Sequence, residues 1–276
     1  MSHTQRVDRS NPALIVLAVD QSESMSDPLA GSTISKAQAV ADHINNLLYE
    51  LVLRSVKNPR EEPRPYFFVD VVGYSTDDSG QPVVRRELAP VSPDGGPFST
   101  TQYAARPLRI DSQPGAGGAT NRPVWVEPRA SGGTPMCLAL DHAGRMAADW
   151  VREHPRGYPP IVINMSDGEA TDGDPSVWCR RIQGLATEDG HTLVFNIGLS
   201  DHPAQPALFP SSVTGLGDPY AERLFEMSSP LPAPMIQSAN GQGIAVAPGA
   251  RAFAFNADIR TLALFLNVGT SIGRAV

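Results

Sequence analysis

Apolar and polar residues alternate along the chain in blocks that predict buried strands joined by amphipathic helices. Residues 13–19 form a continuous apolar run that ends at Asp20, a pattern typical of a strand buried on both faces. A polar loop follows, and apolar residues then recur at helical spacing over 34–56, with Ser32 or Thr33 as the expected cap. The chain therefore opens with a strand, a polar loop and a helix.

The same alternation continues to the C-terminal end. Further apolar runs predict strands over 66–72, 82–88, 161–165, 192–197 and 251–255. Helical spacing predicts helices over 136–150, 175–188 and 220–227, and a last helix capped by Asn256 that carries Ile259, Leu262, Leu266 and Ile272. Buried strands that alternate with helices indicate an α/β fold with a mainly parallel sheet covered on both sides.

The domain organisation is expected to be simple. Residues 1–12 are polar and predict a loose, flexible tail, and 13–276 are long enough for a single domain. The segment 91–131 is rich in glycine and proline, which indicates an insertion or an elaborated hairpin. Its GAGG stretch at 115–118 does not close a strong strand and open a helix, so a flexible loop is favoured over a phosphate-binding loop.

Composition argues against nucleic-acid binding and against binding to an anionic membrane. The formal net charge is −7, so the chain lacks the cationic excess with which proteins neutralise nucleic acid phosphates or an anionic membrane. The N-terminal stretch has no apolar core of a signal peptide, and no run approaches the length of a membrane span, so a cytoplasmic protein is expected. Cys137 and Cys179 fall within predicted helices without a short CxxC spacing, which favours buried thiols, and the histidines show no zinc-binding spacing.

Three polar loops carry the candidate chemistry: DQSES at 20–24, SGGTP at 131–135 and SDGE at 166–169. Asp20, Ser22 and Ser24 alternate, so the backbone can direct three oxygens toward one point, as a hard cation requires. Neutral hydroxyls would leave a bound dication under-neutralised, and such an ion would accept a carboxylate from outside. If the strands at 13–19 and 161–165 are neighbours, their polar ends share one crevice, where open parallel sheets bind ligands.

These residues resemble the von Willebrand factor A domain and its metal-ion-dependent adhesion site. The D-x-S-x-S pattern is Asp20, Ser22 and Ser24, followed downstream by Thr134 and Asp167. The resemblance implies a doubly wound, Rossmann-like fold and an ion held by these five residues, directly or through water. Its open coordination position would take a Glu or Asp from a protein partner. Oxygen ligands and retained waters favour Mg²⁺, with Mn²⁺ or Ca²⁺ as substitutes.

The resemblance also bears on partners and on competing functions. Bacterial soluble members of the family that the chain resembles sit in assemblies with ATPases, or with kinase and phosphatase partners of tellurium-resistance-type systems. The leading hypothesis is therefore a non-catalytic, metal-dependent protein-binding module. A metal-dependent phosphohydrolase is the alternative, but its second aspartate would stand where the chain has Ser22, and no G-x-S-x-G elbow occurs. A structural interaction domain without a functional metal is the third possibility.

Several of the polar residues also have structural interpretations. Thr134 is expected to cap the helix at 136–150, a role compatible with ligation. Asp167 before a glycine fits a turn, and Glu169 is expected to be solvated or to lie behind the ligands. Asp172 and Asp174 are expected at a loop and a helix start, where carboxylates complement the helix dipole.

Overall fold

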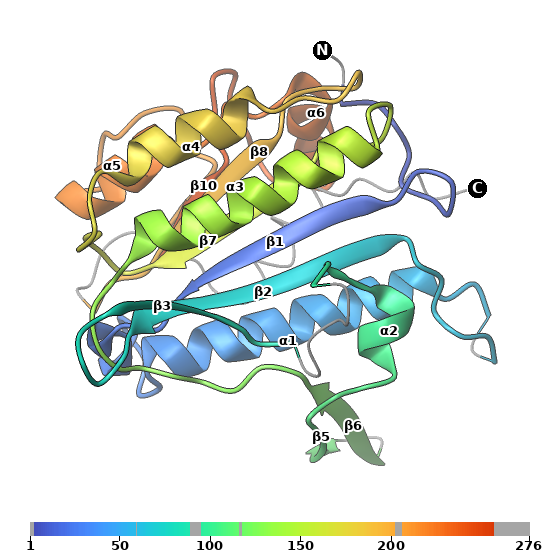
Figure 1. Ribbon diagram of the computed structural model, residues 1–276, viewed down its shortest axis with the longest axis horizontal. Helices are drawn as coiled ribbons and strands as arrows, with labels where there is room; N and C mark the ends of the chain where they lie inside the picture. Colours follow the sequence, from blue (N-terminus) through green and yellow to red (C-terminus); the bar gives the residue numbers. More distant parts are fainter. Residues whose placement is uncertain (1–2, 59, 89–94, 116–117, 202–205, 257–276) are drawn as a thin grey trace.

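The computed structural model describes the chain except for residues 1–2, 59, 89–94, 116–117, 202–205 and 257–276. The described residues form one large sheet with helices on both sides (Figure 1). The strands of this sheet are β1 (Ala13–Asp20), β2 (Phe67–Thr76), β3 (Pro82–Arg86), β4 (Phe98–Ser99), β7 (Ile161–Ser166), β8 (Leu193–Gly198), β9 (Ala207–Leu208) and β10 (Phe253–Phe255). The helices are η1 (Glu23–Ser26), α1 (Lys36–Ser55), α2 (Thr100–Ala104), α3 (Met136–Glu153), α4 (Pro175–Gly184), α5 (Pro219–Met227) and α6 (Ala233–Gly241).

The large sheet is mostly parallel, as the sequence predicts. Its strand order is β3-β2-β1-β7-β8-β10-β9, with β4 pairing beside β2. The pairs β1·β2, β1·β7, β7·β8 and β8·β10 are parallel, whereas β3, β4 and β9 pair antiparallel at the edges. The predicted α/β class, a doubly wound and mostly parallel sheet, is therefore confirmed.

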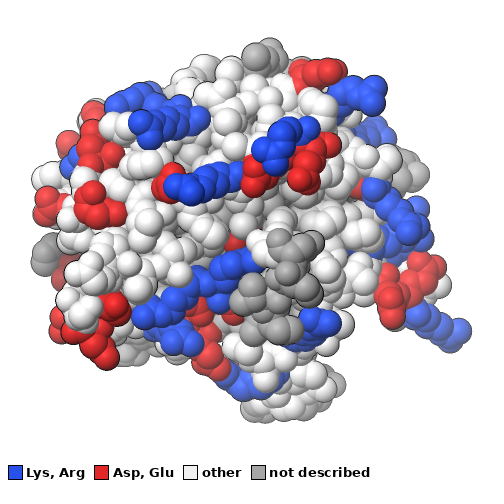
Figure 2. Space-filling view, in the orientation of Figure 1, with Lys and Arg blue, Asp and Glu red and all other residues white. Residues whose placement is uncertain are grey.

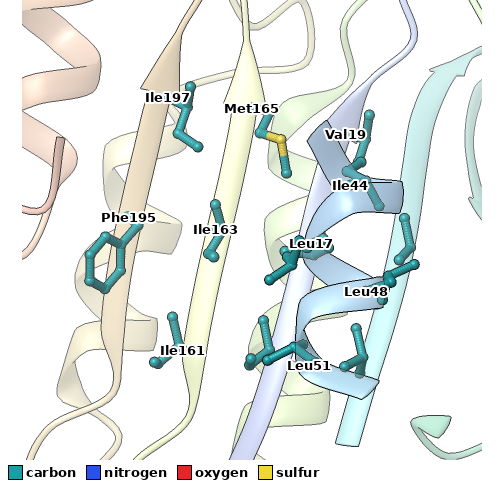
Figure 3. Close-up of a cluster of buried hydrophobic side chains, with 14 of the residues drawn as sticks. Leu17, Val19, Ile44, Leu48, Leu51, Ile161, Ile163, Met165, Phe195 and Ile197 are labelled. Carbon is teal, nitrogen blue, oxygen red and sulfur yellow. The ribbon is translucent and has the colours of Figure 1, made fainter. Parts of the chain in front are cut away.

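Both faces of β1 are buried, which explains its unbroken apolar sequence. Ile15, Leu17 and Val19 join the core on the α1 side, which is drawn in Figure 3. Val16 and Ala18 join the core on the α3 side. Alternate side chains of a strand point to opposite faces, so a strand covered on both sides needs apolar residues at every position.

The helices form two layers, one on each side of the sheet. The core on one side contains residues of α1 and α6, and the core on the other contains residues of α3, α4 and α5. Figure 1 shows α3, α4 and α5 on the near side and α1 on the far side. The chain therefore leaves β1 through α1 on one face and enters β7 from α3 on the other. This makes the boundary between β1 and β7 the topological switch point, and the carboxyl ends of these two strands are hereafter called the β1–β7 edge.

Some helix boundaries differ from the sequence expectation. The cap of α1 is Ser35, whose hydroxyl accepts from the Gln38 N–H at 3.1 Å, rather than Ser32 or Thr33. The loop before α1 is held instead by the antiparallel bridge between Pro28 and Ser35. Helix α4 ends at Gly184 rather than at 188, because the following residues turn back in a bridge between Ala186 and His191. Helices α2 and α6 are not predicted by the sequence patterns, and the predicted last helix lies outside the described residues.

The glycine- and proline-rich segment contains regular structure. It includes β4, α2 and a separate two-stranded hairpin of β5 (Arg109–Gly115) and β6 (Gly118–Val124), which projects below α1 in Figure 1. Trp125 anchors the end of this hairpin, because its indole N–H donates to the Tyr103 carbonyl at 2.7 Å and its backbone N–H donates to Asn45 at 2.8 Å.

The N-terminal residues differ from the expected loose tail. The backbone N–H groups of Thr4 and Gln5 donate to the Asp189 carboxylate at 2.9 and 3.2 Å, and Val7 is buried in the core on the α1 side. The N-terminal segment is therefore attached to the body of the domain, through the Asp189 carboxylate at Thr4 and Gln5 and through the core at Val7.

The surface carries both signs of charge. Lys and Arg atoms are interspersed with Asp and Glu atoms over the face in Figure 2 rather than gathered into one field. Within the described ranges, no helix combines the length and the apolar composition needed to cross a bilayer.

Candidate metal centre

Strands β1 and β7 are direct neighbours, and this adjacency brings the first and third polar loops together. The parallel register pairs Val19 with Met165, so Asp20 and Asp167 follow at the same edge of the sheet. The adjacency that the sequence left open is confirmed. The polar ends of both strands lie at the switch point, where doubly wound sheets bind their ligands.

Asp20 is a buried carboxylate that accepts hydrogen bonds from two residues, Ser22 and Ser166. It is 1% exposed. Its Oδ1 accepts from the Ser22 N–H at 2.9 Å, and its Oδ2 accepts from the Ser166 hydroxyl at 2.6 Å. Ser166, the last residue of β7, also accepts from the Gly168 N–H at 3.1 Å. These bonds fix the Asp20 carboxylate in one orientation.

The hydroxyls of Ser22 and Ser24 link the first loop to Asp167 by hydrogen bonds. The Ser22 and Ser24 hydroxyl oxygens lie 3.1 Å apart, and the Ser24 hydroxyl donates to Asp167 Oδ1 at 3.0 Å. An octahedron of oxygens at the Mg²⁺–O distance of 2.0–2.1 Å places neighbouring ligands about 2.9 Å from each other. The spacings match ordinary hydrogen bonds and are also compatible with ligation of a small, hard dication by oxygens.

The SGGTP loop is tied to the first loop by backbone hydrogen bonds. The Ser131 N–H donates to the Gln21 carbonyl at 2.7 Å, and the Glu23 N–H donates to the Gly132 carbonyl at 2.9 Å. Gly132 has a φ of +75°, and a Cβ there would lie 2.4 Å from the Thr76 hydroxyl. The close approach of this loop to the end of β2 therefore requires glycine at this position.

Thr134 lies at the start of α3 and is 8% exposed. Its N–H donates to the Thr171 hydroxyl at 3.2 Å, and its carbonyl accepts from the Thr171 N–H at 2.9 Å. The expectation that Thr134 caps α3 is wrong. The N-cap is Pro135, and the N–H groups of Cys137 and Leu138 donate instead to the Asp172 carboxylate at 3.0 and 2.9 Å.

All five predicted site residues thus belong to loops that meet at one edge of the sheet. The capping of α3 by Asp172 joins the second loop to the third and frees the Thr134 side chain from the capping role. The acidic residues that follow Asp167 before α4 have structural partners, as the sequence suggested. Asp174 caps α4, and Glu169 is exposed and accepts from the Tyr220 hydroxyl at 3.2 Å.

Burial dominates the electrostatics of Asp20. Loss of water around the carboxylate raises its pKa from 3.8 to about 6, although the hydrogen bonds from Ser166 and Ser22 act in the opposite direction. The nearby negative charge of Asp167 raises the pKa further. Such a carboxylate is unfavourable in its charged form without a cation, which is the condition under which a metal ion stabilises it.

Two further residues belong to the site but were not predicted as part of it. Ser166 orients Asp20, and Lys36, the first residue of α1, places its ammonium 2.6 Å from Asp167 Oδ2. Within the described ranges, no group of three or more His, Cys, Asp or Glu side chains could hold a metal ion. A cation at this edge therefore depends on hydroxyl oxygens. Cys137 and Cys179 are buried free thiols, as expected.

No family model matches the sequence, and no curated protein matches it. Solved structures with a similar fold include the pilus adhesin SpaC from Lactobacillus rhamnosus GG, at 12% identity and a TM-score of 0.50, covering 97% of this chain and 31% of that chain. Proximal thread matrix protein 1 from the mussel byssus matches at 14% identity and a TM-score of 0.46, covering 95% of this chain and 48% of that chain. Manganese-loaded TRAP protein of Plasmodium vivax matches at 15% identity and a TM-score of 0.37, covering 71% and 60%.

The chain thus spans about a third to three fifths of these proteins. The match to SpaC supports the fold alone, and the two lower TM-scores add nothing to it. The fold and the site together define a doubly wound α/β domain with carboxylate and hydroxyl groups gathered at its switch point. This architecture is consistent with the von Willebrand factor A fold that the sequence resembles.

Proposed function

We propose that this chain is a metal-dependent protein-binding module that holds Mg²⁺ at the β1–β7 edge and uses it to capture a partner's carboxylate. The observation that carries the proposal is the position of the Ser24 hydroxyl oxygen, 3.1 Å from that of Ser22 and 3.0 Å from Asp167 Oδ1, together with the buried Asp20. Asp20, Ser22, Ser24, Thr134 and Asp167 would hold the ion. When bound, the ion would supply a centre of positive charge that could accept an oxygen ligand from outside.

Binding of a partner carboxylate follows from the chemistry of the ligand set. Two carboxylates and three neutral hydroxyls are fewer oxygens than the six that Mg²⁺ coordinates. A remaining position would hold water, which a carboxylate from an Asp or Glu of another protein could replace. An ATPase, kinase or phosphatase partner remains a prediction that rests on the resemblance, as does the cytoplasm as the compartment.

Titration calorimetry with Mg²⁺ and with Mn²⁺ tests the metal part of the proposal. We expect the wild type to bind one ion and Asp20→Ala to bind at least about 100-fold more weakly, because loss of even an outer-shell group costs 10- to 100-fold. Glu153→Ala serves as the control, since this exposed carboxylate lies at the other end of α3. Equal heats from the wild type and Asp20→Ala would contradict the proposal.

Affinity chromatography tests whether the bound ion mediates binding of a partner's carboxylate. The immobilised chain should retain its partner in Mg²⁺ and release it in chelator, and Asp20→Ala should retain it in neither condition. An identical set of captured proteins under both conditions would show that partner binding does not depend on the ion. Metal-dependent hydrolysis of p-nitrophenyl phosphate that is lost in Asp20→Asn would favour the phosphohydrolase alternative instead.

A further inference from the structure

Lys36 is a buried cation inside the candidate metal centre. Its side chain is 4% exposed, and its ammonium lies 2.6 Å from Asp167 Oδ2 and 3.8 Å from Asp27 Oδ2. The side chain of Asp27 is 52% exposed, whereas that of Asp167 is 6% exposed. Water screens the pair with Asp27, so Asp167 is the main counter-charge of the ammonium.

The position of this lysine is unfavourable for local reasons. Lys36 is the first residue of α1, where the helix dipole is positive and disfavours a cation. Burial of an ammonium also costs solvation free energy, which only a close and well-placed partner offsets. Residues that conflict with local preferences are expected at functional sites. The lysine is therefore explained by the carboxylate that it faces rather than by the helix that it begins.

The ammonium already gives Asp167 the positive partner that a metal ion would give it. Asp167 Oδ1 accepts from Ser24, and Oδ2 accepts from Lys36, so both oxygens are in use. Resting on the proposed function, we infer that Lys36 is a built-in counter-cation of the metal centre. It holds Asp167 in place without metal, weakens the binding of a divalent ion, and leaves the loaded centre with a positive charge.

The charge balance shows the consequence for partner binding. Asp20, Asp167 and Lys36 together carry one negative charge, so a dication brings the centre to one positive charge. A carboxylate from a partner neutralises that charge. Without Lys36, the same dication would already be neutralised by the two aspartates and would attract an anion less. Lys36 thus makes metal binding weaker and carboxylate binding stronger, and the two ligands should bind cooperatively.

Mn²⁺ titration, monitored by electron paramagnetic resonance, separates the effect on metal binding from the effect on carboxylate binding. We expect Lys36→Met to bind Mn²⁺ at least about tenfold more tightly than the wild type, because removal of a nearby positive charge favours a dication. Acetate in place of chloride, at constant ionic strength, should raise the Mn²⁺ affinity of the wild type and raise that of Lys36→Met less. Lys57→Met is the matched control, since Lys57 is the chain's other lysine and is exposed.

Thermal unfolding provides a readout independent of affinity. In chelator, Lys36→Met should melt below the wild type, because Asp167 loses its counter-charge, and saturating Mn²⁺ should remove that difference. Equal or weaker Mn²⁺ binding by folded Lys36→Met would overturn the inference while leaving the proposed function intact. Failure of the variant to fold even in Mn²⁺ would also overturn it, because the ion would then not replace the ammonium. Absence of Mn²⁺ binding by both proteins would instead contradict the proposed function.

Discussion

Replacement of Asp20 by asparagine is expected to stabilise the metal-free protein at neutral pH by about 1–3 kcal/mol while abolishing its stabilisation by Mg²⁺. Burial raises the pKa of Asp20 from 3.8 to about 6, so the charged form carries a cost of about 1.4 kcal/mol per pKa unit in the folded state. Asparagine keeps an acceptor for the Ser22 N–H, and toward Ser166 it replaces the carboxylate acceptor by an amide N–H donor, but it carries no charge. Urea unfolding in chelator and in saturating Mg²⁺ measures both effects.

The pH dependence has a definite sign. A carboxylate whose pKa is raised on folding binds its proton more tightly in the folded state than in the unfolded state. The contribution of Asp20 to the free energy of unfolding is therefore greatest in acid and is lost as the pH rises from about 4 to about 6. Asp20→Asn should lack this loss, whereas the control Glu153→Gln should retain it. Equal stability of Asp20→Asn and the wild type in chelator at neutral pH would contradict this account of the buried carboxylate.

Replacement of Arg86 by alanine is expected to cost about 3–5 kcal/mol of unfolding free energy, because it removes the guanidinium that pairs with the buried Asp70 carboxylate. Asp70 is fully buried in β2, and its two oxygens accept from the Arg86 Nε at 2.8 and 3.1 Å. Arg86 also donates to the carbonyls of Gly95 and Gly96 at 2.9 and 2.6 Å. One guanidinium therefore compensates a core carboxylate and holds a loop. Urea unfolding in chelator measures the loss.

The neighbouring arginine is a matched control for this change. Arg85 lies next to Arg86 in β3, is exposed, and donates to the Ser75 hydroxyl at 2.8 Å. Arg85→Ala should cost at most about 1 kcal/mol, the value of one ordinary hydrogen bond. The addition of Asp70→Asn to Arg86→Ala should recover part of the loss, since no charge is then stranded. Losses of similar size at both arginines would show that the buried pair is not the cause.

The strands that position the site were predictable because they are buried on both faces. Such strands require long apolar runs, and the run at 13–19 stops at a carboxylate that lies at the strand end. Helix ends were harder to predict, because contacts distant in sequence decide them. Asp172 caps α3 from another loop, and the turn from Ala186 to His191 ends α4 early. A local pattern contains no information about such contacts.

The candidate ligands were predictable from a short pattern, whereas their supporting residues were not. Asp20, Ser22 and Ser24 stand close together in the sequence, and the D-x-S-x-S spacing directs attention to them. Lys36 at a helix start resembles an ordinary exposed lysine until Asp167, distant in sequence, is placed beside it. Asp70 offered a weak signal, as a lone carboxylate inside an apolar run followed by two adjacent arginines in the next strand.

Anomalous diffraction from crystals saturated with Mn²⁺ tests the central claim most directly. We expect a single strong anomalous peak at the β1–β7 edge, within coordination reach of Asp20, Ser22, Ser24, Thr134 and Asp167, directly or through water. A crystal of Asp20→Ala grown under the same conditions should lack the peak. Full occupancy of Mn²⁺ elsewhere on the chain, with the Lys36 ammonium still bound to Asp167 and no peak at this edge, would contradict the account.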